Sequence, residues 1–111
     1  MRKLIAIIFM VPAMAYAEFW TGNNLYQRMT SSDMTDRIQA MGYVMGVYDV
    51  GVHAMFCPQD ESGITVGQIT DMAKNWLAAN AHRRHESAEK LVRESFRQIW
   101  PCANRRSKGS V

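Results

Sequence analysis

Three side chains that could do chemistry recur every four residues along the chain: Asp49, His53 and Cys57. On a helix this spacing places all three on one face. A histidine held by a carboxylate could orient and deprotonate a nucleophilic cysteine. With His82 and His85 added, the same set offers the ligand types of a zinc site. Both interpretations require a free thiol at Cys57, and isolated spacings of this kind are weak signals.

The cysteine count argues against that chemistry. Cys57 and Cys102 are the only two cysteines, and a secreted domain with two cysteines usually pairs them. A disulfide removes the thiol that both a nucleophile and a zinc site would need. No Gly-rich nucleophile turn or second acid supports hydrolysis. We therefore predict a disulfide between Cys57 and Cys102, no enzymatic activity, and no metal or other cofactor.

The first residues predict export from the cytoplasm. Arg2 and Lys3 precede an uncharged, mostly apolar run over residues 4–14, and a small-x-small cleavage pattern ends at Ala17. The alternative is an uncleaved membrane anchor, but the run is about half of the roughly 20 residues needed to span a bilayer. The sequence therefore predicts a signal peptide over residues 1–17 that is cleaved after Ala17, and no stable membrane anchor.

The charge of the mature chain excludes a nucleic-acid-binding protein. Residues 18–104 carry 8 Lys and Arg against 10 Asp and Glu, which is not the basic stripe of such a protein. Residues 105–111 hold Arg105, Arg106 and Lys108. We expect these residues to form a basic, disordered tail, more plausibly a solubilising end than a segment that binds anionic surfaces.

Glycine and proline punctuation, together with the apolar period, predicts four helices and no strong strand pattern over residues 18–104. The first covers about 22–29, and the second begins after an N-cap at Ser32 or Asp33 and ends at Cys57. The third opens with a capping box between Thr65 and Gln68. The fourth ends before Pro101. The expected fold is all-α, a small four-helix-type bundle with one disulfide after the signal peptide.

Each longer helix has an apolar face that we expect to be buried. In the second helix it comprises Ile38, Met41, Met45, Tyr48, Val52 and Met55. In the third it comprises Ile69, Met72, Ala73, Trp76 and Leu77, and in the fourth Ala88, Leu91, Val92, Ser95, Phe96 and Ile99. Salt bridges Glu86–Lys90 and Glu89–Arg93 are expected on the wet side of the fourth helix. The disulfide would join the ends of the second and fourth helices, which would then run roughly parallel if they pack as neighbours.

Two glycines inside the second helix, Gly42 and Gly46, need a reason, because each costs about 0.5–1 kcal/mol relative to alanine. They could form a membrane dimer face, a tight packing face or the floor of a binding site. Asp49 and His53 on the same side argue against a membrane helix, where charges are costly. We expect the glycines to admit a neighbouring helix closely, with the second helix buried on two faces.

Several fragments together resemble the Rap/Tai family of type VI secretion immunity proteins. They are "TGNNLYQRM", "GYVMGVYDV", the long run "FCPQDESGITVGQITDMAKNWLAANAHRRHESAEKLV" and "FRQIWPC". The resemblance covers residues 19–102. Its most specific positions are Gly42-Tyr43 with Gly46 and Asp49, Cys57-Pro58, Gly67-Gln68, Arg84-His85 with Ala88, and Pro101-Cys102. Many relatives carry a further cysteine pair, and here Met29 and Ala40 stand at about those places.

The resemblance implies a small helical protein of the periplasm that binds and occludes a toxic effector, typically a cell-wall amidase, and that is a homodimer in some members. The matching positions are expected to be scaffold residues, so the resemblance predicts the fold better than it predicts the target. These scaffold positions are Gly42, Tyr43, Gly46, Asp49, Thr65, Gln68 and His85. Exposed loops suggest contacts at Gln59, Asp60, Glu61, Ser62, His82, Arg83 and Arg84. The alternative function is a periplasmic binding or chaperone-like module with an unrelated client.

Overall fold

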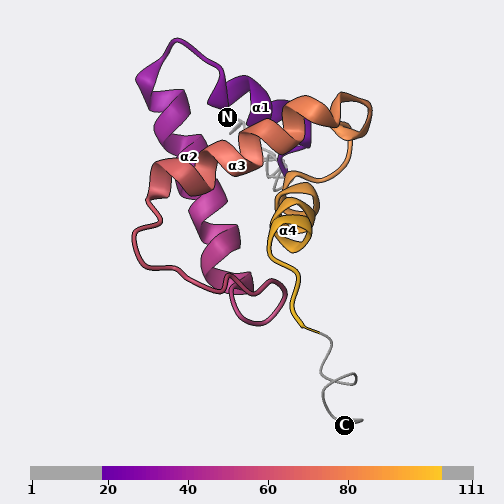
Figure 1. Cartoon of the computed structure of the whole chain (residues 1–111). Helices are drawn as coiled ribbons and strands as arrows, with labels where there is room; N and C mark the ends of the chain where they lie inside the picture. Colours follow the sequence, from indigo (N-terminus) through magenta and orange to yellow (C-terminus); the bar gives the residue numbers. More distant parts are fainter. Residues whose placement is uncertain (1–18, 104–111) are drawn as a thin grey trace, which may run out of the picture.

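The structure, a computed structural model, describes residues 19–103 and contains four α-helices and one 3-10 turn in that range. The helices are α1 (Gly22–Met29), α2 (Met34–Gly51), α3 (Val66–Ala79) and α4 (Ala88–Ile99), and the turn η1 (Ala81–Arg83) joins the last two. Helix α2 contacts each of the other three helices, and α3 lies across it (Figure 1). The predicted all-α fold is confirmed. The predicted signal peptide (1–17) and basic tail (105–111) lie outside the described residues.

The helix starts follow from the capping residues in the sequence. Thr65 Oγ1 accepts a hydrogen bond from the Gln68 N–H at 3.1 Å, and Gln68 Oε1 accepts one from the Thr65 N–H at 2.9 Å. This confirms the predicted capping box, which satisfies two backbone donors of the first turn of α3. Asp33, one of the two predicted caps of α2, accepts from the Thr35 N–H at 2.9 Å. Thr21 and Asn24 form a second capping box on α1.

The buried face of α2 is not the predicted one. The buried residues of α2 are Ala40, Val44, Tyr48 and Gly51. Of the predicted stripe only Tyr48 is buried, whereas Ile38, Met41 and Met55 are exposed. Successive helical residues are about 100° apart, so Met45 lies about a quarter turn away from the core-facing Val44. The stripe prediction was wrong because α2 is apolar almost all round, and spacing alone cannot then select one face.

The other two long helices follow their predicted patterns closely. In α4, five of the six predicted residues are buried, and Ile99 is the exception, being exposed near the helix end. In α3, Ile69, Ala73 and Leu77 are buried, while Met72 and Trp76 are half-buried. Both predicted ion pairs of α4 are present, Lys90–Glu86 at 3.1 Å and Arg93–Glu89 at 3.5 Å. The strong apolar periodicity of α4 explains this success.

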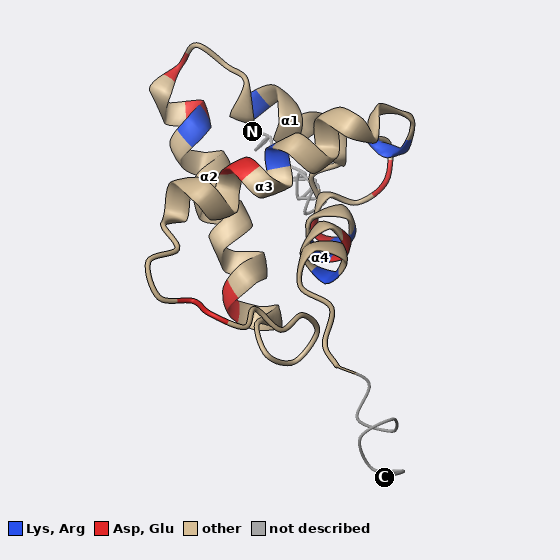
Figure 2. Ribbon diagram, viewed as in Figure 1, with Lys and Arg blue, Asp and Glu red and all other residues tan. Residues whose placement is uncertain are grey.

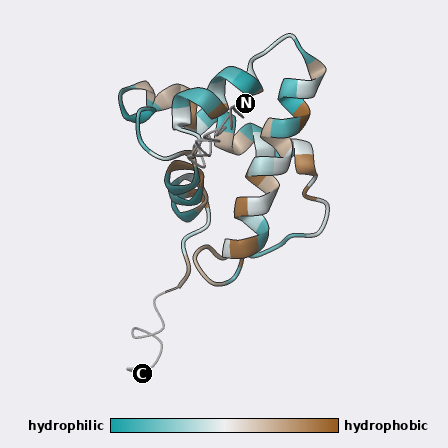
Figure 3. Cartoon of the chain, turned by 180° about the vertical axis from the view of Figure 1, so that it is seen from behind, coloured by the Kyte–Doolittle hydropathy of each residue, from teal (hydrophilic) through white to brown (hydrophobic). Residues whose placement is uncertain are grey.

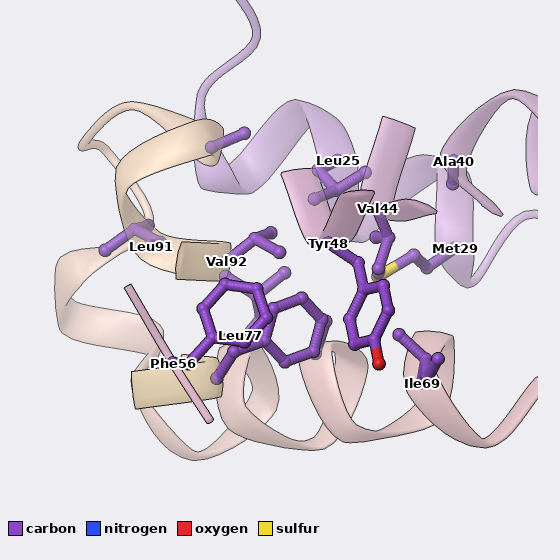
Figure 4. Packing of buried hydrophobic residues seen from close by; sticks show 13 residues of the cluster. Leu25, Met29, Ala40, Val44, Tyr48, Phe56, Ile69, Leu77, Leu91 and Val92 are labelled. Atoms are coloured by element: carbon purple, nitrogen blue, oxygen red, sulfur yellow. The ribbon is translucent and has the colours of Figure 1, made fainter. Parts of the chain in front are cut away.

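The core is continuous through all four helices and ends in an aromatic cluster. Figure 4 shows Leu25 of α1, Val44 and Tyr48 of α2, and Leu77 of α3 converging. Beside Tyr48 lie three further rings, with centroid separations of 5.1 Å for Phe56–Phe96 and 5.7 Å for Phe96–Trp100. Tyr48 lies edge-on to Phe96 at 5.8 Å. Burying large aromatic side chains supplies much of the stability of a small domain.

The predicted disulfide between Cys57 and Cys102 is present, with 4.7 Å between the Cα atoms. Cys57 does not end a helix, however, because α2 stops at Gly51. The chain turns sharply at His53, whose φ is 68°, and the Cys57 N–H then donates to the Trp100 carbonyl at 2.8 Å. Figure 1 shows α4 nearly end-on beside α2, so the two helices cross, and the expectation of roughly parallel helices is wrong.

Residues 20–23, at the start of α1, are tied to the turn before α4 by backbone hydrogen bonds. The Gly22 N–H donates to the Glu86 carbonyl at 2.9 Å, and the Asn23 N–H donates to the Arg84 carbonyl at 2.8 Å. In return, the Ala88 N–H donates to the Trp20 carbonyl at 2.8 Å. These bonds satisfy donors at the starts of both α1 and α4, which would otherwise lack partners.

The glycines of α2 do not serve the close packing that we expected. A Cβ atom built on Gly42 or Gly46 would have nothing within 4 Å, and both residues are exposed. The close approaches lie elsewhere. A Cβ on Gly51 would come within 2.5 Å of the Phe56 ring, and one on Gly22 within 3.0 Å of the Arg84 Cα. The prediction that α2 is buried on two faces is therefore wrong, and the side with Gly42 and Gly46 is open.

This difference between the glycines gives a direct test by alanine substitution. Gly46→Ala should raise the free energy of unfolding by about 0.5–1 kcal/mol, because it adds helix propensity without meeting any atom. Gly51→Ala should lower it by about 1–3 kcal/mol, because its methyl group would overlap the Phe56 ring. Urea unfolding followed by circular dichroism measures both. Equal effects of the same sign would contradict the packing described here.

Candidate partner-binding surface

The three side chains with catalytic spacing do not form a site. Asp49 is exposed on α2, His53 lies beyond the end of that helix, and Cys57 is bonded to Cys102. Within residues 19–103, no group of three or more His, Cys, Asp or Glu side chains could hold a metal ion. Among the described helices, none is long and apolar enough to cross a bilayer.

The first predicted contact loop, residues 59–62, is fixed from within the protein. The Tyr48 hydroxyl donates to Glu61 Oε1 at 2.8 Å, and His53 Nε2 lies 2.8 Å from Glu61 Oε2. These hydrogen bonds hold the pKa of Glu61 below its usual value, while burial and the nearby Glu61 raise the pKa of Tyr48 to about 12. Asp60 accepts from the Ser62 N–H at 3.0 Å. Glu61 therefore braces the loop, and Gln59, Asp60 and Ser62 remain exposed.

The second predicted contact segment, residues 82–84, also uses its charges internally. The Arg83 guanidinium binds Glu86 at 2.8 Å and Glu94 at 2.8 Å, and it lies 5.6 Å from the centroid of the Trp76 ring. Arg84 stacks over the Tyr26 ring at 4.2 Å. Both arginines are half-buried, and only His82 of this segment is exposed.

The two predicted contact segments lie far apart. Residues 59–62 precede α3 and residues 82–84 follow it, so the 14 residues of α3 separate them, a length of about 21 Å at 1.5 Å per residue. Figure 1 shows the loop before α3 and the turn after it on opposite sides of the molecule. The structure therefore does not bring them into one surface.

The scaffold positions have distinct surroundings. Tyr43 stacks on Trp20, with 5.0 Å between the ring centroids, and Arg28 lies 4.5 Å over the Trp20 ring. Thr65 and Gln68 cap α3, as described. His85 is exposed beside Arg84. Gly42, Gly46 and Asp49 lie on the open side of α2, so these motif positions border a surface rather than the core.

The open side of α2 forms an apolar groove that the sequence analysis missed. We call it the α2 groove, and its volume is about 430 Å³. It is lined by Phe19, Gly42, Tyr43, Gly46, Val47, Val50, Gly51, Met55, Glu89 and Arg93. Figure 3 shows hydrophobic residues on the ribbon of α2 toward its C-terminal end. The signal that could have found the groove was the glycine pair, which we assigned to helix packing.

Charge is sparse along this part of the molecule. In Figure 2 the middle of α2 is tan, and coloured charges lie near both of its ends and along α4. The two charged residues at the groove, Glu89 and Arg93, bind each other. The lining of the α2 groove is therefore apolar apart from one ion pair, and exposed Asp49 lies beside it on the same side of α2.

Comparison with known proteins supplies the context for this surface. A family model described as Rap1a immunity proteins matches residues 21–102. The chain belongs to the Rap1a immunity protein family. This confirms the resemblance found in the sequence. A search of the curated proteins finds no match to the chain.

The match spans the whole described fold, from the N-cap of α1 to the second cysteine. As a Rap1a immunity family member, the protein has a role in immunity to a toxic effector, and such a role suggests an inhibitor rather than an enzyme. The groove, the braced loop and the internal ion pairs all suit a preformed binding surface, because rigid partners lose less entropy on association.

The Arg83 cluster of this Rap1a family protein predicts loss of stability in acid. Hydrogen bonds from Arg83 and Lys90 lower the pKa of Glu86 from 4.5 to about 2, and Arg83 also lowers the pKa of Glu94. Since these folded pKa values lie below the unfolded ones, the stabilisation is complete above pH 4.5 and is lost as the pH falls toward 2. The midpoint of urea unfolding should fall over that range.

The matched variant for this prediction is Arg83→Gln, which keeps a hydrogen-bonding side chain but removes the charge. Its unfolding midpoint should be lower at pH 7 and should change less between pH 5 and pH 2 (in roughly the window set by the acid pKa values). An unchanged pH dependence in Arg83→Gln would show that other carboxylates cause the acid unfolding.

Proposed function

We propose that the chain is a periplasmic immunity protein that binds a toxic effector delivered by a type VI secretion system and blocks its active site. The observation that carries this proposal is the family match over every described helix. The effector we propose is a cell-wall amidase. Residues 1–17 would direct export and leave after Ala17, since the target of an amidase lies outside the cytoplasm.

The described structure supports binding by a rigid surface. The disulfide joins the end of α4 to the loop after α2, and capping boxes fix the starts of α1 and α3. A preorganised interface with a few desolvated anchors dissociates slowly, and slow dissociation is what protection against a lethal enzyme requires. Contacts at residues 59–62 and 82–84 and a homodimer remain predictions, and sedimentation velocity would measure the oligomeric state.

Coexpression tests the proposal. Each peptidoglycan hydrolase encoded beside this gene is directed to the periplasm of a laboratory bacterium, with or without the full-length chain. We expect lysis by one hydrolase, and its suppression by the chain. Equal lysis with and without the chain for every neighbouring hydrolase would refute the proposed function. Recovery of many weakly bound clients, instead of one stoichiometric hydrolase, would favour the chaperone-like alternative.

A further inference from the structure

Three large apolar side chains that line the α2 groove are exposed to solvent. Val50 is 77% exposed, Met55 40% and Phe19 84%, and all three line the groove. A contiguous apolar surface with a polar rim commonly marks a protein-binding site. An immunity protein that acts by binding must be covered in part by its effector. An apolar, concave surface among the described residues suits that contact.

Gly42 and Gly46 form the floor of the groove because neither has a side chain. A Cβ at either position would have nothing within 4 Å, so any larger side chain there would fill open space and not the core. Each glycine weakens α2 by about 0.5–1 kcal/mol relative to alanine, and the packing of the fold gives no return for that cost. The depth of the groove is the structural consequence of both residues.

The charges around the groove indicate which chemistry it accepts. Arg93 Nε lies 3.5 Å from Glu89 Oε1, and Arg93 Nη1 lies 4.0 Å from Met55 Sδ. The two charged residues that line the groove are therefore paired with each other, and the exposed carboxylate of Asp49 lies beside the groove on the same side of α2. A charged side chain inserted among the apolar lining residues would lose water without gaining a partner there, which is costly. An uncharged, apolar segment matches the lining.

A second exposed apolar surface on α2 lacks these properties. Met34, Ile38 and Met41 lie on the other side of the helix, about 200° around from the groove at 100° per residue. The cavity beside Met41 is smaller, about 180 Å³. Its other lining residues are Met29, Arg37, Gly67, Thr70, Asp71 and Lys74. With two cations and an acid in its wall, this surface offers no comparable apolar hollow.

We propose that the α2 groove receives an uncharged apolar segment of the effector, so that immunity depends on a cavity in this protein as well as on surfaces that protrude from it. This inference rests on the proposed function. Its anchors would be the side chains of the effector that fill the volume above Gly42 and Gly46. Concave, largely apolar pockets of a few hundred Å³ are the usual seats for such anchors.

Two variants alter the groove and leave the fold intact. Gly46→Leu fills the floor from within, and Val50→Glu places a charge on the apolar wall. Each has a matched control with the same substitution at the start of α3, Gly67→Leu and Val66→Glu, since both of those residues are also exposed. All four should stay folded, because none meets the core, and Gly46→Leu should unfold at a somewhat higher urea concentration than the wild type, because it gains helix propensity.

The probe is the parent bacterium itself, which delivers the effector without its having been identified. Strains carrying each variant, or a deletion of the gene, are grown in contact with the parent on a solid surface, and survivors are counted. We expect the deletion strain to be killed and both α3 controls to survive. Both groove variants should approach the survival of the deletion strain, because losing one anchor weakens binding by roughly 30-fold or more.

Other results distinguish a failure of the groove inference from a failure of the proposed immunity function. Full protection by Gly46→Leu and Val50→Glu, in a strain background where the deletion is killed, would overturn the groove inference and leave the proposed function standing. Survival of the deletion strain would overturn the proposed function and this inference with it. Sedimentation velocity adds a third readout: if either groove variant converts a dimer to a monomer, the groove is covered by a second copy, and the inference is wrong.

Discussion

The Cys57→Ser, Cys102→Ser double variant should lose about 4 kcal/mol of unfolding free energy, because opening the loop restores conformational entropy to the unfolded chain. The two cysteines are 45 residues apart in sequence, which sets this magnitude. A domain of this length has a total stability of roughly 5–14 kcal/mol. Urea unfolding of the oxidised protein and the double variant, followed by tryptophan fluorescence, measures the difference.

Reduction supplies the control for this result. Wild-type protein unfolded in the presence of a thiol reductant should match the double variant in the absence of the reductant, and the reductant should leave the variant unchanged. If the double variant unfolds at the wild-type urea concentration, the disulfide adds nothing to the free energy of unfolding, and helix packing alone stabilises the fold. A single Cys57→Ser variant should behave like the double variant, since either change opens the same loop.

Phe56→Ala should lower the free energy of unfolding by about 3–5 kcal/mol, the usual cost of deleting a buried aromatic ring. Phe56 is 0% exposed and packs against Phe96 and Trp100. It also covers Gly51, where no larger residue fits. Phe56 therefore packs the end of α2 against the aromatic residues at the C-terminal end of α4, next to the disulfide.

The exposed Phe19 provides the matched control, because Phe19→Ala deletes the same ring at the surface. It should change the free energy of unfolding by no more than about 0.5 kcal/mol. Thermal unfolding of both variants checks the pair. A small loss in Phe56→Ala would mean that Tyr48 and Trp100 close over the vacated volume, and the aromatic cluster would then be less tightly packed than described.

Local chemistry explains which parts of the fold could be predicted from sequence. The capping pair Thr65 and Gln68, the cap at Asp33 and the disulfide depend on a few residues whose side chains have one favourable use. The buried face of α4 was predictable for a related reason, since charged residues occupy its other faces. In these cases sequence and tertiary structure demand the same arrangement.

Helix α2 could not be oriented in the same way. Apolar residues lie on most of its sides, so more than one apolar stripe can be drawn along it. The predicted stripe was the one with the longer side chains. The structure buries Ala40 and Val44 beside Tyr48, so the core-facing side of α2 keeps only one residue of the predicted stripe. Which face is covered depends on α1, α3 and α4, which all contact α2, and no local pattern in α2 contains that information.

The candidate site was harder still. Exposure suggested residues 59–62 and 82–84, yet Glu61, Arg83 and Arg84 have partners within the protein. Charged residues in loops are often predicted as contact residues, but here each has a partner that its own segment does not contain: Tyr48 for Glu61, Glu94 for Arg83 and Tyr26 for Arg84. The α2 groove is made by absent side chains, and glycine has several structural uses. Only the empty space above Gly42 and Gly46 distinguishes a cavity floor from a packing face.

The hydrogen bonds that join Gly22 and Asn23 to the turn before α4 also limit when the protein can fold. A chain is synthesised from its N-terminus, so α1 emerges long before the residues to which it is tied. Contacts between distant parts of a sequence form slowly, because a long loop must close first. The fold can therefore be completed only after α4 has been synthesised. Until then the apolar residues of α1 and α2 stay exposed to solvent. Of the four described helices, the one synthesised last therefore completes the backbone hydrogen bonds of the one synthesised first.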